Sequence, residues 1–140
     1  MFDRMLFRKN QRRYIQPEWK ITRECLNFIL ESAKATYPKE FAGLLRAEHN
    51  IIKEVLILPG TVQGDTHAIF NFSMLPIDFS VVGTVHSHPS PSFHPSSADL
   101  QLFSKRGRVH IIVGVPFSED SWQGYNWRGE PIKIEIVDKF

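Results

Sequence analysis

The sequence is poor in cysteine, with only Cys25 among 140 residues. One thiol cannot form a disulfide framework within the chain, and this composition fits a reducing compartment, so we expect a cytoplasmic protein. A zinc deaminase, whose pattern requires His-x-Glu together with Cys-x-x-Cys, is excluded for the same reason. Cys25 itself is interpreted as a small buried core residue, because no local pattern supplies a histidine to activate it.

Long apolar runs and excess charge are also missing. No stretch approaches the roughly 18 apolar residues of a membrane-spanning helix, and residues 1–8 hold no apolar run of the secretory-signal kind. The formal net charge is only +2, and residues 1–20 carry six Lys or Arg against two Asp or Glu. We interpret residues 1–16 as a basic, flexible leader. An anchor for nucleic acid is the alternative, although so short a basic segment binds weakly and is sensitive to salt.

Apolar and aromatic residues, in contrast, suffice for a packed core. The chain holds eleven Phe and three Trp, and 42% of its residues are hydrophobic. A chain of this length fits one domain, which we place at residues 17–140.

A histidine-rich segment follows the apolar stretch at residues 81–85, which reads as a buried strand. Because side chains two residues apart on a strand face the same side, His86 and His88 project together. Pro89 cannot donate to a sheet ladder and should end the strand. The loop that follows is stiffened by prolines and would return Asp99 to the two histidines as a third ligand.

Two histidines and one carboxylate make a three-ligand set. Structural zinc sites usually fill all four positions with protein groups, whereas catalytic sites use three and leave one for water. The single Cys25 lies far away in the sequence, so no usual fourth ligand is near. We therefore expect a hydrolytic zinc site, at which the pKa of bound water falls to about 7. Other divalent metals also fit such a ligand set.

Ser96 and Asp99 allow a second interpretation. Ser-x-x-Asp at the start of a helix is typical of an N-cap whose third residue answers it, as in a capping box. The preceding His-x-His favours Asp99 as a ligand, and Ser96 can serve as a cap and in the site at once. His94 is a possible competing ligand, but its position between prolines and polar residues favours an exposed side chain.

The pattern His-Ser-His-x7-Ser-x-x-Asp, preceded by Glu40 in Glu-Phe-Ala-Gly, resembles the JAMM (MPN+) family of zinc metalloproteases over roughly residues 17–140. The resemblance implies one zinc ion held by His86, His88 and Asp99. It also implies that Glu40 acts as general acid and base and that Ser96 helps to stabilise the oxyanion. Composition alone does not distinguish Glu40 from the other acidic residues, fifteen in all.

The resemblance further implies a stand-alone, deubiquitinase-like isopeptidase that acts on a ubiquitin-like protein or its conjugates. The short connection between Asp99 and the apolar strand at residues 110–116 leaves no room for the insertion of linkage-selective relatives. Residues 67–72 are a candidate edge strand for the extended tail of the substrate. Two alternatives stay open: a processing protease for small sulfur-carrier proteins and, less favoured because all five site residues are present, a non-catalytic MPN scaffold. Binding to nucleic acid or to a membrane is not expected, and the oligomeric state is open.

Periodicity and turn residues predict a mixed α/β fold. We expect a curved, largely antiparallel mixed sheet flanked by one long and one or two short helices, which is the shape of the cytidine-deaminase-like MPN fold that the resemblance implies. The long helix spans residues 23–36 with Thr22 as its cap, and the short one begins at Ser96 and ends near residues 105–107. Strands are predicted at residues 19–21, 41–46, 51–58, 67–72, 81–85 and 110–116, with a final hairpin of residues 121–126 and 132–137.

Overall fold

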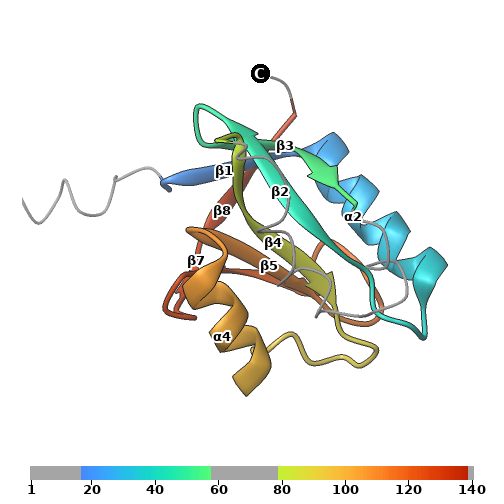
Figure 1. Ribbon diagram of the computed structural model, residues 1–140. Helices are drawn as coiled ribbons and strands as arrows, with labels where there is room; N and C mark the ends of the chain where they lie inside the picture. The colour runs from blue at the N-terminus through green and yellow to red at the C-terminus, as the bar shows by residue number, and fades with distance from the viewer. Residues whose placement is uncertain (1–16, 58–78, 139–140) are drawn as a thin grey trace, which may run out of the picture.

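The structure is a computed structural model that describes residues 17–57 and 79–138. Within these residues, one twisted sheet of eight strands carries two helices (Figure 1). The predictions for the leader at residues 1–16 and for a strand at residues 67–72 lie outside the described residues. The elements in chain order are β1 Trp19–Thr22, α2 Arg23–Thr36, β2 Ala42–Glu48, β3 Ile51–Leu56, β4 Val81–Ser87, α4 Ser97–Lys105, β5 Val109–Val113, β6 Trp122–Asn126, β7 Pro131–Ile132 and β8 Ile134–Val137.

The sheet is mixed, as predicted, in the order β7-β6-β5-β4-β2-β3-β1-β8. Strand β2 pairs antiparallel with β3 and β4, and β6 pairs antiparallel with β5 and β7. Strand β1 runs parallel to β3 and β8, and β4 runs parallel to β5. Strands β4 and β5 therefore lie in the interior of the sheet, and their C-terminal ends point the same way.

Helix α2 forms where the sequence predicts it. The Thr22 side chain accepts a hydrogen bond from the Cys25 amide at 3.1 Å, which satisfies one of the unpaired donors of the first turn. The helix ends at Thr36, before Pro38. Its buried face consists of Cys25, Leu26, Ile29, Leu30 and Ala33.

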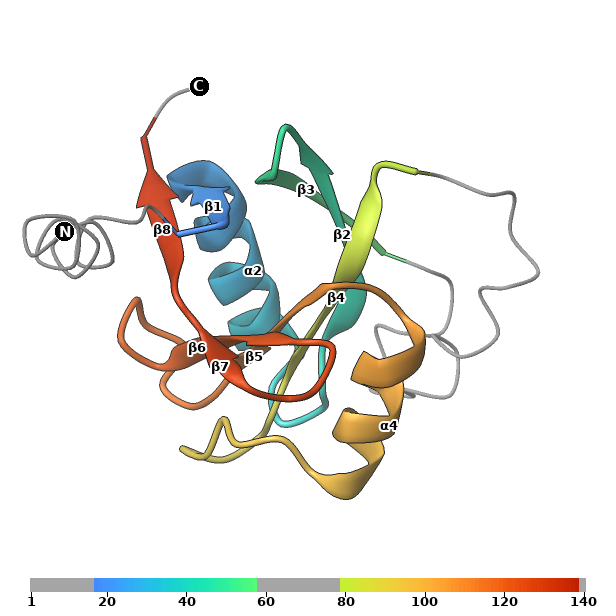
Figure 2. The same cartoon turned by 90° about the vertical axis from the view of Figure 1, so that its left-hand side faces the viewer.

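The two helices cover opposite faces of the sheet (Figure 2). Successive strand residues alternate between two hydrophobic clusters, because side chains along a strand point to alternate sides. Leu45 and Ile111 join the larger cluster under α2, whereas Leu44 and Ile112 join the smaller cluster that contains Phe103 of α4. The α4 face of the sheet carries the polar site described below.

The final hairpin is only partly as predicted. Of the described residues in this segment, only those of strand β7, Pro131–Ile132, pair with β6. The chain then crosses to the opposite edge of the sheet, where β8 pairs in parallel with β1 and Trp19 lies opposite Ile134. Alternation marks residues as strand but does not specify the partner, and the hairpin prediction for residues 132–137 was wrong for that reason. The turn between β2 and β3 is tight, with His49 and Asn50 at φ 52° and 61°, as a two-residue type I′ turn requires.

No helix in the two described segments combines the length and the apolar character that crossing a membrane requires.

Candidate metal centre

The C-terminal end of β4 places the two histidines. A reciprocal pair of hydrogen bonds joins it to the start of β2: the Phe41 amide donates to Ser87 Oγ, and the Ser87 amide donates to the Phe41 carbonyl, both at 2.8 Å. On the other side the His88 amide donates to the Val113 carbonyl at 2.8 Å. The His86 side chain is 1% exposed and the His88 side chain 15% exposed. The neighbouring strands thus hold both rings at the α4 face of the sheet.

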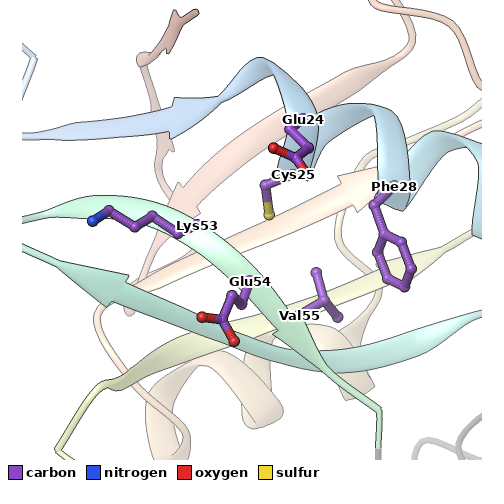
Figure 3. Close-up of a pocket in the computed structure, with 6 residues that line it drawn as sticks. All are labelled: Glu24, Cys25, Phe28, Lys53, Glu54 and Val55. Carbon is purple, nitrogen blue, oxygen red and sulfur yellow. The ribbon is translucent and has the colours of Figure 1, made fainter. Parts of the chain in front are cut away.

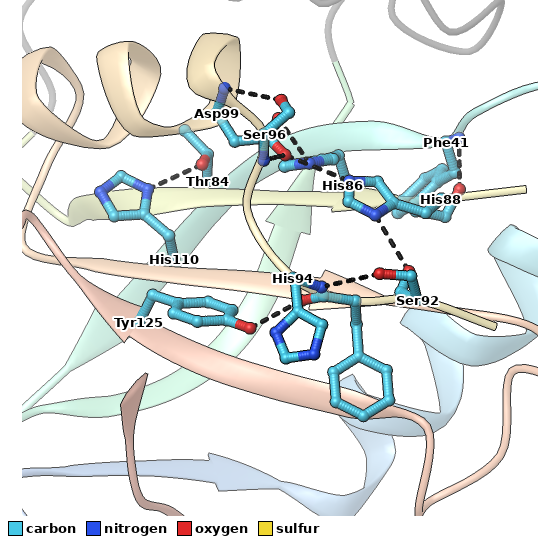
Figure 4. Close-up of polar contacts among 12 residues, drawn as sticks. Phe41, Thr84, His86, His88, Ser92, His94, Ser96, Asp99, His110 and Tyr125 are labelled. Atoms are coloured by element: carbon cyan, nitrogen blue, oxygen red, sulfur yellow. Dashed lines mark hydrogen bonds and ion pairs between the residues drawn. The ribbon is translucent and has the colours of Figure 1, made fainter. Parts of the chain in front are cut away.

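The first turn of α4 supplies the carboxylate. Ser96 is the N-cap, its Oγ accepts the Asp99 amide at 3.1 Å, and Asp99 Oδ2 accepts the Ser96 amide at 2.9 Å. The capping-box interpretation is therefore confirmed. The same carboxylate faces both rings, with Oδ1 3.0 Å from His86 Nε2 and Oδ2 3.1 Å from His88 Nε2 (Figure 4). One ligand atom from each of the three residues lies within 4.8 Å of the others.

The hydrogen-bonding chemistry of this cluster fits a cation. His88 Nδ1 lies 3.0 Å from the Ser92 carbonyl, which only accepts, so Nδ1 carries a hydrogen, and whenever the ring is neutral Nε2 presents its lone pair to Asp99. A lone pair and a carboxylate repel unless a positive charge lies between them. His86 Nε2 is buried and lacks hydrogen-bonding geometry within the described residues, despite its short distance to Asp99. A metal ion satisfies all three groups together.

The electrostatics agree with this reading. Burial opposes ionisation of Asp99, but contacts with the His86 and His88 rings and the Ser96 amide hold its pKa far below the ordinary range. The hydrogen bond with Asp99 raises the pKa of His88 against partial burial, and the charge of Glu40 adds to the rise. A proton and a metal ion therefore compete for the same place.

Glu40 is half-buried and directly precedes Phe41, whose hydrogen bonds fix β2 to the histidine strand. This connection explains how a residue 46 positions away from His86 comes near the cluster. His94 lies exposed beside Phe93 and does not belong to the cluster, as expected.

Sequence reasoning did not identify the roles of two buried residues on the α4 face. His110 stacks on Phe103 with ring centroids 4.3 Å apart, and Tyr125 donates from its hydroxyl to the Phe93 carbonyl at 2.6 Å. Burial, reinforced by the charge of Asp99, raises the pKa of Tyr125, so the hydroxyl stays a donor. Tyr125 lies in the sequence between Trp122 and Trp127, and its position on a strand gives no signal of the loop that it contacts.

A pocket of about 250 Å³ lies away from this cluster, between α2 and β3 (Figure 3). It is lined by Glu24, Cys25, Phe28, Lys53, Glu54 and Val55. Burial raises the pKa of the Cys25 thiol to about 12, with smaller contributions from Glu54 and Glu24. A thiol so rarely ionised is a poor nucleophile. Cys25 is buried within the larger hydrophobic cluster, which confirms it as a core residue.

The fold and the three converging side chains define an α+β domain with a cluster that can hold a metal ion. Residues 22–126 match the family described as prokaryotic homologs of the JAB domain, and the chain belongs to this JAMM/MPN family. A relative from Haloferax volcanii, named "Probable metalloprotease", is 38% identical over 128 residues, covering 84% of this chain and 79% of the relative.

Solved structures agree. One, described as JAMM, a metalloprotease-like zinc site in the proteasome and signalosome, is 41% identical with a TM-score of 0.70, covering 86% of this chain and 98% of its own. A JAB1/MPN domain protein from Archaeoglobus fulgidus is 40% identical with a TM-score of 0.69, covering 86% and 97%. The cluster of His86, His88 and Asp99 fits a single zinc ion, in line with these neighbours.

Proposed function

We propose that the chain is a zinc-dependent protease that hydrolyses isopeptide or peptide bonds at the C-terminus of ubiquitin-like proteins. The observation that carries the proposal is the convergence of two histidines and one carboxylate, with no fourth protein ligand in the cluster that the described residues form. An open position is what a hydrolytic zinc site needs. The relationship to a protein named as a probable metalloprotease supports the same chemistry.

The proposed ligands are His86 Nε2, His88 Nε2 and the Asp99 carboxylate. A zinc ion held there supplies Lewis-acid activation of water and of the scissile carbonyl. Glu40 takes a proton from the attacking water and returns it to the leaving amine, as general base and then general acid.

Ser96 is proposed to serve the site as well as the helix. Its Oγ accepts the Asp99 amide, and accepting leaves the hydroxyl hydrogen free to donate to the developing oxyanion. The capping bond also fixes where that hydroxyl lies, so the donor is preorganised.

The substrate class follows from the resemblance and from the compactness of the domain. The chain passes from α4, which ends at Lys105, to β5, which begins at Val109, through three residues. This short connection supports a minimal enzyme without a linkage-selecting insertion. A narrow extended tail of the Gly-Gly kind suits backbone pairing with a sheet edge.

Glu40→Gln tests the proposal. We expect hydrolysis to fall by about 10²–10⁴-fold, the usual contribution of a general acid and base, while zinc binding is retained. Turnover is measured on a ubiquitin-like protein joined to a lysine side chain and on the same protein with a peptide-linked C-terminal extension. The pair of substrates separates deconjugation from C-terminal processing.

The matched control is Glu31→Gln, which makes the same change on the exposed side of α2, where Glu31 pairs with Lys34. It should leave turnover unchanged. Near-wild-type turnover by Glu40→Gln would remove Glu40 from the mechanism. A zinc-loaded wild type that cleaves neither substrate would favour the non-catalytic scaffold.

A further inference from the structure

The loop between His88 and α4 is fastened through two adjacent carbonyl groups. The Ser92 carbonyl accepts from His88 Nδ1 at 3.0 Å, and the next carbonyl, of Phe93, accepts from the Tyr125 hydroxyl at 2.6 Å. Figure 4 shows both contacts on the same segment. The bond to the Ser92 carbonyl orients His88, a proposed metal ligand. The bond from Tyr125 to the Phe93 carbonyl attaches the same loop segment to the sheet.

Tyr125 is held rigidly enough to anchor the loop through this hydrogen bond. It lies on β6, its side chain is buried, and its ring stacks with Phe103 of α4 at a centroid distance of 5.8 Å. The loop residues themselves offer little burial, since Ser90, Pro91 and Ser92 are all exposed. The position of the Ser92 carbonyl therefore depends on hydrogen bonds that attach the loop to the sheet, such as the bond from Tyr125 to the Phe93 carbonyl.

A second contact fixes the same loop near its start. The Val115 amide donates to the Ser90 carbonyl at 2.8 Å. At Gly114 an added Cβ would lie 3.0 to 3.2 Å from the carbonyl oxygens of Ser90, Pro91 and Ser92. Such contacts are tighter than most Cβ contacts, so a side chain at residue 114 would displace the loop from the end of β5 by a few tenths of an ångström.

We propose that Tyr125 is a positioning residue of the metal centre: its hydroxyl fixes the Ser92–Phe93 segment and thereby turns His88 Nε2 toward the metal. The proposal rests on the proposed function, because it assumes that His88 is a ligand. A ligand ring whose second nitrogen is held by a carbonyl keeps one tautomer and one orientation, and partners of this kind affect metal affinity strongly.

Tyr125→Phe removes the hydroxyl and keeps the stacked ring. We expect zinc to bind about 10-fold more weakly, at the lower end of the roughly 10–100-fold range for groups behind a metal ligand. The dissociation constant is measured by competition with a chromophoric chelator. Tyr37→Phe, the same change at the end of α2, should leave it unchanged. Ser121→Ala removes a hydroxyl that holds the 118–121 turn and controls for a general loss of stability.

A second measurement, made without metal, follows the tautomer of the His88 ring. In the metal-free wild type, at a pH high enough for the His88 ring to be neutral, ¹⁵N spectra of the imidazole should show a single tautomer with hydrogen on Nδ1, and Tyr125→Phe should show a mixture. Gly114→Ala displaces the same loop from the other side and should weaken zinc binding too, which keeps the test decisive if Tyr125→Phe does not fold. Zinc affinity within twofold of wild type in a folded Tyr125→Phe variant, or in Gly114→Ala if Tyr125→Phe does not fold, would overturn the positioning role and leave the proposed function intact. A wild type that binds no zinc would overturn both.

Discussion

Two histidine environments lie side by side on the α4 face and differ in one feature, a carboxylate. Thr84 on β4 is in register with His110 on β5, and two residues along β4 lies His86. His86 and His88 face Asp99, whereas His110 lies between Phe103 and the Thr84 hydroxyl. The same residue type, at similar depth in one sheet, is thus built into two different kinds of site.

The hydrogen bonds of His110 are complete in its neutral form. Nε2 donates to the Gly107 carbonyl at 3.1 Å, which leaves Nδ1 to accept from the Thr84 hydroxyl at 2.7 Å. Burial lowers the pKa of His110 to about 4. Within the cluster, by contrast, the hydrogen bond with Asp99 raises the pKa of His88. The carboxylate thus favours a positive charge on or beside the histidines of the cluster, whereas His110, which has no carboxylate partner, stays neutral and packs in the core.

The first prediction is that acid lowers the stability of the protein through His110. Above pH 6.5 His110 is neutral in both the folded and unfolded states. As the pH falls from 6.5 toward 4, the unfolded chain binds a proton at this residue and the folded chain does not, so its stability is lost in that window. The loss reaches about 3 kcal/mol at pH 4. Free energies of unfolding in denaturant from pH 7 to pH 4 measure it.

The control is the double variant His110→Phe with Thr84→Val, which removes the Thr84 hydroxyl together with the ring nitrogen that it binds. The Gly107 carbonyl loses its His110 donor, but Gly107 is exposed. Relative to this double variant, the wild type should lose the additional stability between pH 6.5 and 4. Parallel pH profiles for the two proteins would show that His110 is not held neutral, and the comparison would fail.

Ser96→Ala tests the cluster that contains Asp99, where Ser96 caps α4 and is proposed to donate to the oxyanion. Loss of the cap should cost about 1 kcal/mol of stability, and loss of an oxyanion donor should lower turnover by about 10²-fold. Thr22→Ala is the matched control, since Thr22 caps α2 in the same way at a distance from the metal centre. Equal turnover in the two variants, after correction for the folded fraction, would leave Ser96 with the cap alone.

Local patterns predicted most of the fold. The cap and apolar face of α2 are encoded in neighbouring residues, and the Ser96 capping box is a four-residue motif, so both were found. The partner of β8 was missed, because strand pairing between distant segments depends on the packing of the whole sheet.

The site shows the same division. His86, His88 and Asp99 lie within 14 residues of one another, and their spacing predicted the cluster. Glu40 lies just before β2, far from this segment in the sequence, so only the family resemblance identified it. Tyr125 contacts a backbone carbonyl, a partner that has no sequence signal at all.

The most direct test of the account is the zinc content of the purified protein by elemental analysis. Wild type, Asp99→Ala and the His110→Phe, Thr84→Val double variant are measured side by side. We predict one zinc ion per chain in the wild type and in the double variant, and none in Asp99→Ala. A metal-free wild type that also fails to take up added zinc would contradict the account, and Asp99 would then serve only in the capping box of α4, in a domain without a metal centre.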